Sequence, residues 1–131
     1  MKHIKYGFGK KVSYSFELAI EKVTMELQKE GFGVLTKIDV SETLKKKLDQ
    51  DMPPYQILGA CNPQFAHHAL EKEPSIGLLL PCNVVVRQDN SANVFVEFMD
   101  PQAVLELVGN PEINQVASEV RSRLERVLSA L

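Results

Sequence analysis

Alternation of hydrophobic and polar residues predicts half-buried strands in two stretches of the first third of the chain. In the first stretch, His3–Phe8, the side chains of Ile4, Tyr6 and Phe8 share one face. The second stretch, 32–40, places Phe32, Val34, Thr36, Ile38 and Val40 on one face and Leu35, Lys37 and Asp39 on the other, more polar face. Each stretch therefore predicts a strand that turns one face toward the core.

A different period, with hydrophobic residues three and four positions apart, predicts an amphipathic helix between these two strands. Ser13 or Ser15 can cap its start, and Gly31 is the expected stop at its end. Its core positions are Phe16, Ala19, Ile20, Val23 and Leu27. A second, short helix is predicted over 41–49, before consecutive prolines force the chain into an extended conformation.

Proline marks the starts of three further helices. In each case an Asn or Asp that can cap a helix precedes a proline, whose missing N–H costs nothing at the first helical position. These pairs are Asn62-Pro63, Asp100-Pro101 and Asn110-Pro111. The first of these helices follows a predicted strand at 55–61 and ends by Glu73, and the second ends at Gly109. The last carries a hydrophobic stripe that predicts a buried face, formed by Ile113, Val116, Ala117, Val120, Leu124, Val127, Leu128 and Leu131.

Two strands at 83–87 and 94–99 are predicted to form a hairpin. The valines at even positions and Phe98 are expected on the core face, and directly opposed residues of a hairpin lie on the same face. This parity requires a loop of odd length, for which the three residues 89–91 are the simplest choice. The resulting register places Val84 opposite Val96, Cys82 opposite Phe98 and Asn83 opposite Glu97.

The order of these elements predicts an α+β fold, a two-layer sandwich in which a mainly antiparallel five-stranded sheet has its helices on one face. At 131 residues, the chain is expected to form a single domain over 1–131. The uncovered sheet face would mix charged and hydrophobic side chains, which suits either water or a second subunit. Its expected members are Lys5, Lys37, Asp39, Arg87, Glu97, Leu35, Val85, Phe95 and Met99.

Composition and charge narrow the class of protein. The chain is 44% hydrophobic and 24% charged, with a net charge of −2. These values are typical of a globular protein and provide no electrostatic case for binding nucleic acid or an anionic membrane. Two cysteines are too few for a disulfide-stapled secreted scaffold, and neither a signal peptide nor a transmembrane span is recognisable. We therefore expect a soluble, cytoplasmic protein with reduced thiols and no nucleic-acid or membrane partner.

The sequence offers one candidate metal pair and one candidate nucleophile. His67 and Glu71 lie one turn apart on a predicted helix, a spacing that lets both reach one ion, but no CxxC or HxxxH pair is present. Cys61 precedes that helix, whose positive N-terminal end could lower the pKa of the thiol, with His67 or His68 as a base. The alternative is that the cysteines are buried free thiols and the histidines lie at the surface. No cofactor is predicted, and a metal ion stays an alternative.

A ligand pocket is expected near the proline-rich segments around 51–55, 60–63 and 75–83. The candidate ligand-binding residues are Tyr55, Cys61, Asn62 and Asn83. Backbone N–H groups at a helix start can hold an anion, and polar side chains give direction to the contact. The alternative is that the prolines only shape the crossings between sheet and helices. No dinucleotide-binding, phosphate-loop, serine-hydrolase or zinc-protease motif is present.

Five segments of the chain carry a resemblance to a known family. GFGVLTKIDV, TLKKKL, DMPPYQILGACNPQFAHHAL, EPSIGLLLPCNVVV and VEFMDP resemble the DUF302 family, a domain of unknown function. The resemblance implies a compact α+β domain like a single copy of the TATA-binding-protein-like fold, often a homodimer, and it implies no established reaction. We expect a homodimeric module that binds a small molecule, with an anion as a candidate ligand, or serves an accessory role, rather than an enzyme. The alternatives are a thiol-dependent enzyme or redox-responsive protein using Cys61 with His67 or His68, and a metal-binding protein.

Overall fold

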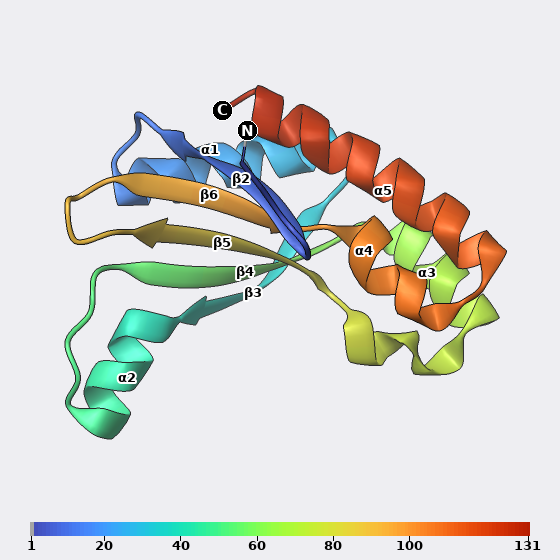
Figure 1. The fold of residues 1–131 in the computed structure, drawn as a ribbon, viewed down its shortest axis with the longest axis horizontal. Coiled ribbons are helices and arrows are strands. Elements are labelled where there is room, and N and C mark those ends of the chain that lie inside the picture. Colours follow the sequence, from blue (N-terminus) through green and yellow to red (C-terminus); the bar gives the residue numbers. More distant parts are fainter. Residues whose placement is uncertain (1) are drawn as a thin grey trace.

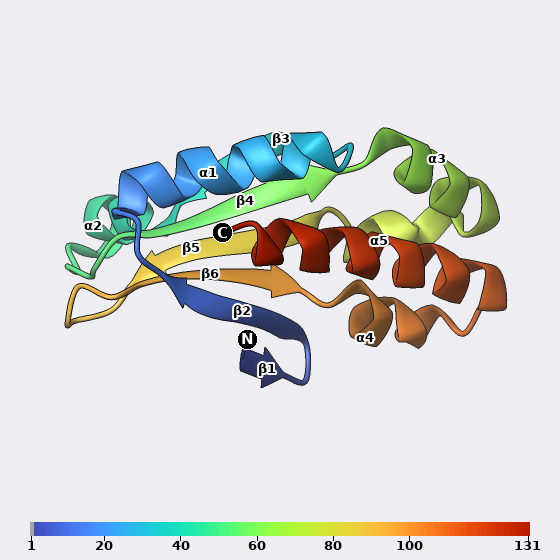
Figure 2. The same cartoon turned by 90° about the horizontal axis from the view of Figure 1, so that it is seen from above.

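In the computed structural model, which describes residues 2–131, six strands form one antiparallel sheet, and α1 and α5 cover one of its faces (Figures 1 and 2). The strands are β1 (Lys2–Ile4), β2 (Gly7–Val12), β3 (Gly33–Asp39), β4 (Tyr55–Cys61), β5 (Cys82–Gln88) and β6 (Val94–Met99), in the spatial order β1-β2-β6-β5-β4-β3. The helices are α1 (Phe16–Lys29), α2 (Val40–Leu48), α3 (Pro63–Lys72), α4 (Pro101–Leu105) and α5 (Pro111–Ser129), with short 3₁₀ helices η1 (Pro74–Leu79) and η2 (Glu106–Val108). The predicted two-layer α+β class is confirmed.

The described sheet has six strands rather than five, because His3–Phe8 is not one strand. The chain turns after Ile4 and re-enters the sheet at Gly7, so that β1 and β2 form a hairpin. Phe8 is buried as predicted, whereas Tyr6 lies in the turn and is 67% exposed. The alternation that predicted the first strand extends into the turn, and alternation alone does not show where a strand reverses.

A bulge in β3 corrects the faces predicted for that strand. Val34 lies opposite Ala60, but Thr36 lies opposite Gly59, so Leu35 is the extra residue. One inserted residue exchanges the two faces beyond it. Thr36 and Ile38 therefore lie on the open face of the sheet rather than on the core face. Lys37 and Asp39, which were expected on the open face, lie on the other.

The β5–β6 hairpin has the predicted parity but a different register. Val84 lies opposite Phe98 and Val86 opposite Val96, so the loop between the paired positions spans 89–93 rather than 89–91. Asp89 holds this longer loop, because its Oδ1 accepts hydrogen bonds from the backbone N–H groups of Ser91 and Asn93, both at 2.9 Å. Val84 rather than Cys82 therefore lies opposite Phe98, and Val85 rather than Asn83 lies opposite Glu97. On the other side of β5, Cys82 lies opposite Ala60 of β4 and Asn83 lies opposite Gly59.

The helix starts follow the capping chemistry read from the sequence. Ser15 caps α1, and Asn62, Asp100 and Asn110 cap α3, α4 and α5, each of the last three with proline in the first turn. Gly31 follows α1 with a φ of 85°, a conformation that favours glycine. The start of α2 differs slightly, since Asp39 rather than Ser41 caps it.

The core consists of two clusters, and α5 contributes to both. The larger cluster lies between the sheet and the helices α1 and α5, and the smaller joins α3, η1, α4 and the start of α5. In contrast, α2 buries none of its residues, and Figure 1 shows it projecting from the sheet on the side away from α1 and α5. Among residues 2–131, no helix is long and apolar enough to cross a membrane.

Candidate functional site

The open face of the sheet carries a cavity of about 600 Å³. It is bordered by the end of β1, the β1–β2 turn, β2, β6, β5, the first residue of β4, and α4. The residues on its lining are Ile4, Tyr6, Gly7, Phe8, Gly9, Lys10, Lys11, Tyr55, Asn83, Val85, Arg87, Phe95, Glu97, Phe98, Met99 and Val104. Its volume lies within the range of ordinary small-molecule sites, about 300–1,000 Å³.

Two glycines on β2 create room on this face of the sheet. Gly7 lies opposite Met99 and Gly9 opposite Glu97, so both glycines face the open side. A Cβ atom at Gly7 would lie 2.7 Å from the Phe98 carbonyl oxygen, and one at Gly9 would lie 2.8 Å from Glu97 Cα. The backbones of β2 and β6 therefore approach each other more closely than any side chain would permit. The same absence of side chains hollows the surface over β2.

A row of cross-strand neighbours on β2, β6, β5 and β4 lines the cavity. In spatial order the row is Lys11, Phe95, Arg87 and Tyr55. The Arg87 guanidinium lies over the Phe95 ring at 4.5 Å from its centroid. Its Nε and Nη2 donate to the two carboxylate oxygens of Glu97 at 2.7 and 3.4 Å. Arg87 is therefore fixed on two sides, by an aromatic face and by a bidentate ion pair.

The charges on the lining are predominantly positive. Lys10, Lys11 and Arg87 are basic, and Glu97 is the one acidic group among the lining residues that the structure describes. The hydrogen bond with Glu97 raises the pKa of Arg87, so the guanidinium stays charged at any working pH. Both partners of this ion pair are about one-third exposed, at 32% and 33%. The ion pair is therefore accessible to a ligand from solvent, and its charges can orient a ligand.

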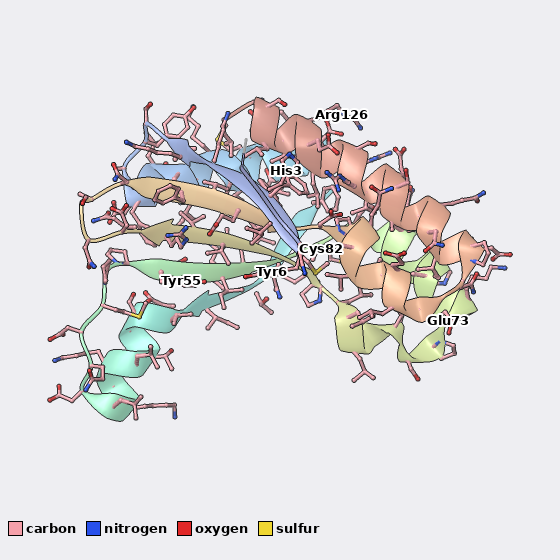
Figure 3. The ribbon with its side chains drawn as sticks, viewed as in Figure 1. His3, Tyr6, Tyr55, Glu73, Cys82 and Arg126 are labelled. Carbon is pink, nitrogen blue, oxygen red and sulfur yellow. The ribbon has the colours of Figure 1, made fainter. Side chains whose placement is uncertain are left out.

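The structure separates the four predicted ligand-binding residues into two groups. Tyr55 and Asn83 line the cavity, from β4 and β5 (Figure 3 labels Tyr55). Cys61 and Asn62 lie outside the lining. Asn62 is buried and has a structural task, because its Oδ1 accepts a hydrogen bond from the Phe65 N–H at 3.4 Å and so caps α3.

The two cysteines lie on neighbouring strands but on opposite faces of the sheet. Cys82 pairs with Ala60 on the core face, and Cys61 is the next residue along β4, so it points to the other side. Both are free thiols. Burial, with a smaller effect from Cys61, raises the pKa of Cys82 from 9.0 to about 11, and burial also raises the pKa of Cys61. A nucleophilic thiolate needs the opposite shift.

The histidines of α3 lie at the surface. His67 Nε2 lies 3.2 Å from the Glu71 carboxylate, as their spacing of one helical turn predicts, and His68 is also exposed. Within residues 2–131, no group of three or more His, Cys, Asp or Glu side chains is placed to hold a metal ion. His67 and Glu71 therefore form an exposed pair without a third ligand from residues 2–131.

The sequence pattern did not predict that the two glycines of β2 and the pair Arg87–Glu97 belong to one site. Arg87 and Glu97 were expected on the uncovered face, but only as charged members of a mixed surface. The isolated pair Gly7 and Gly9 was the available signal, since glycines inside a strand pattern often mark a close backbone approach. Its neighbours became evident only through the pairing of β2 with β6.

This geometry defines a class, a small α+β domain with a ligand-sized hollow on the open face of its sheet. The chain belongs to the family of the domain of unknown function DUF302, whose model matches residues 8–131. It is similar to the crystal structure of an uncharacterized conserved DUF302 protein from Bacillus stearothermophilus, with 30% sequence identity and a TM-score of 0.89. That match covers 95% of this chain and 97% of the other. No curated protein matches the chain. The family resemblance is thereby confirmed, and the likeness to a TATA-binding-protein fold stays a prediction.

Proposed function

We propose that the chain is a small-molecule-binding module whose site is the cavity on the open face of the sheet. The observation that carries this proposal is the combination of a hollow of about 600 Å³ with a guanidinium fixed inside it. Apolar walls with a few well-placed polar groups are typical of ligand sites. Val85, Phe95 and Met99 provide such walls, and Tyr55 and Asn83 provide polar groups.

The thiol-dependent alternative has less support from the same structure. Its nucleophile would be Cys61, and burial moves the pKa of that thiol away from the value required. The metal-binding alternative rests on His67 and Glu71, which have one another as partners. Cys61, His67 and Glu71 lie outside the lining of the open-face cavity, which combines volume, charge and strand-borne side chains.

The direct test is a thermal-shift and calorimetric screen of small organic acids, amines and neutral compounds against the wild-type chain. A compound that binds the folded chain raises the midpoint of unfolding, and the stabilisation grows with the logarithm of one plus the ratio of the free ligand concentration to Kd. The matched variant is Val85→Trp, which adds bulk on the cavity surface, and Leu107→Trp, on a side chain 81% exposed outside the lining, is the control.

Binding that is lost in Val85→Trp and kept in Leu107→Trp supports the proposal. Two results contradict it: no compound stabilises the wild-type chain, or the compounds that bind do so equally well in both variants. Far-UV circular dichroism of both variants establishes that each is folded before binding is compared.

We also propose that the module is a homodimer that associates through α2 and the neighbouring β3. Hydrophobic side chains on these elements are left uncovered, with Leu48 at 63% and Leu35 at 68% exposure, and α2 buries none of its residues. An amphipathic helix without an apolar partner usually finds one in another chain. β3 is also an edge strand at the side of the sheet away from β2, so association there leaves the cavity open.

Sedimentation at micromolar concentration tests the dimer. We expect a species of twice the 14.7 kDa chain mass that becomes monomeric in Leu48→Glu and stays dimeric in Leu107→Glu. A monomeric wild-type chain, or a Leu48→Glu variant that stays dimeric, would refute association through α2. Ligand binding can be measured in either state, so the two proposals are tested separately.

A further inference from the structure

Resting on the proposed ligand site, we infer that its ligand is an amphipathic organic anion: an apolar, preferably aromatic body with one acidic group that competes with Glu97 for Arg87. The cavity lining combines apolar and basic side chains, with Phe95 between Lys11 and Arg87 in one cross-strand row. Val85, Phe95 and Met99 form apolar surface, while Lys11 and Arg87 lie along one row of paired residues.

Arg87 is prepared to bind an anion. The Nε and Nη2 groups of Arg87 donate hydrogen bonds to Glu97, and within residues 2–131 no acceptor is hydrogen-bonded to its Nη1 group. Contact with Phe95 holds the guanidinium plane in place, so a ligand acid meets a donor whose orientation is already set. A guanidinium in a fixed fork favours carboxylate, sulfonate or phosphate oxygens over neutral acceptors.

Glu97 has two opposing effects on the affinity for such a ligand. Its carboxylate orients Arg87 but also neutralises it and repels an incoming acid. Lys11 supplies the remaining positive charge on the same row. We therefore assign Glu97 as a specificity-determining residue, a resident counter-ion that limits affinity for anions and that a ligand acid partly replaces.

A matched pair of fluorescent probes tests this inference. Anilinonaphthalene sulfonate and phenylnaphthylamine share one aromatic body and differ by the sulfonate group. Both are titrated into the wild-type chain at low and high salt. We expect the sulfonate to bind at least threefold more tightly than the neutral probe at low salt, and we expect salt to weaken only the sulfonate.

Charge variants then identify the residues responsible. Lys11→Gln should weaken sulfonate binding about threefold, as expected for one partly screened charge, and Arg87→Gln should weaken it about tenfold or more. Glu97→Gln should strengthen sulfonate binding about threefold or more, because it removes the competing carboxylate. The neutral probe should bind all three variants as it binds the wild-type chain. Lys47→Gln, on an exposed lysine of α2 outside the lining, is the control and should change neither probe.

The outcomes separate this inference from the proposed function. If both probes bind equally well and Glu97→Gln and Lys11→Gln change neither, the inference is overturned while the cavity remains a ligand site. If neither probe nor any screened compound binds, both fall together. Glu97→Gln keeps the size of a partly exposed side chain and Lys11→Gln alters an exposed one, so both keep the inference testable even if Arg87→Gln fails to fold.

Discussion

At the scale of single residues, the open face is shaped most by side chains that are missing. Gly7 and Gly9 let β2 approach β6 closely, and the hollow beside them exposes Arg87 and Phe95. A glycine of this kind acts in two ways at once, on strand pairing and on surface shape. A substitution at Gly9 tests the effect on strand pairing, because the added Cβ would clash with the backbone of β6. The effect on surface shape concerns the side chains that line the cavity.

Gly9→Ala is expected to lower the free energy of unfolding by about 2–3 kcal/mol, because the new Cβ meets the β6 backbone, which cannot move aside without separating the strands. Gly77→Ala is the matched control, since a Cβ there meets nothing within 4 Å. It should stay within about 1 kcal/mol of the wild type. Urea unfolding measures both. Equal effects of the two substitutions would show that the close approach of β2 and β6 is unimportant.

The buried thiol of Cys82 makes stability depend on pH. Its thiol is buried on the core face, and burial raises its pKa from 9.0 to about 11. The folded state therefore binds this proton more tightly than the unfolded state does. The resulting stabilisation is fully present below pH 9 and is lost as the pH rises through about 11.

Wild-type stability should consequently fall by roughly 2–3 kcal/mol more than that of Cys82→Ala between pH 8 and about 11.5, a difference that follows from a pKa shift of about two units. Parallel urea titrations across this pH range make the comparison, and lysine and tyrosine ionisation cancels between the two chains. Identical pH slopes in both chains would contradict a buried thiol with a raised pKa.

At the scale of elements, Asp100 connects three parts of the fold. It caps α4 by accepting hydrogen bonds from the N–H groups of Gln102 at 2.9 Å and Ala103 at 3.4 Å. It also accepts a hydrogen bond from Arg121 of α5, and the Arg121 guanidinium lies over the Phe8 ring of β2 at 5.2 Å. One buried carboxylate thus positions α4 against α5 and the sheet.

Asp100→Ala should therefore cost about 2–3 kcal/mol, since it removes a cap and leaves Arg121 without its buried partner. Ser15→Ala removes only an exposed cap, whose hydroxyl accepts from Leu18 at 3.2 Å, and should cost about 0.5–1 kcal/mol. Asp100→Asn can keep the cap and should fall between them. Thermal unfolding of the three variants orders them, and a cost of Asp100→Ala no larger than that of Ser15→Ala would contradict the connecting role.

At the scale of the whole molecule, α5 joins two hydrophobic clusters into one cooperative unit. Ile113 and Ala117 belong to the smaller cluster, and Val120, Leu124 and Leu128 belong to the larger. Figure 2 shows α5 running along the sheet and over the end where α3 and α4 lie. We therefore expect that a deletion in either part of α5 disturbs both clusters.

Ile113→Ala and Leu124→Ala should each cost about 2–5 kcal/mol, as deletions of fully buried side chains do. Both should lower hydrogen-exchange protection in α3 and in β5 together, although each changes a different cluster. Native-state hydrogen exchange of the two variants measures this coupling. Loss of protection confined to α3 in Ile113→Ala would show instead that the smaller cluster opens independently.

The helix boundaries were the most predictable feature of the fold. Asn62, Asp100 and Asn110, each followed by proline, cap helices at the predicted positions. The β5–β6 parity was also predictable, because it follows from which side chains are hydrophobic. The register was not, because Asp89 organises a loop two residues longer than the simplest one through hydrogen bonds that the pattern does not specify.

The features that could be predicted from the amino-acid sequence are the helix starts and stops, the buried stripe of α5, and the two-layer α+β class. Helix capping and hydrophobic periodicity involve residues that are close together in the sequence, so they can be recognised without the tertiary structure. The composition of the open face, in contrast, depends on how distant strands pair. The bulge at Leu35 exchanged the faces of β3, and pairing across long sequence separations brought Gly9, Glu97 and Arg87 together. Strand pairing depends on contacts between distant segments, and the candidate site exists only where those contacts are made.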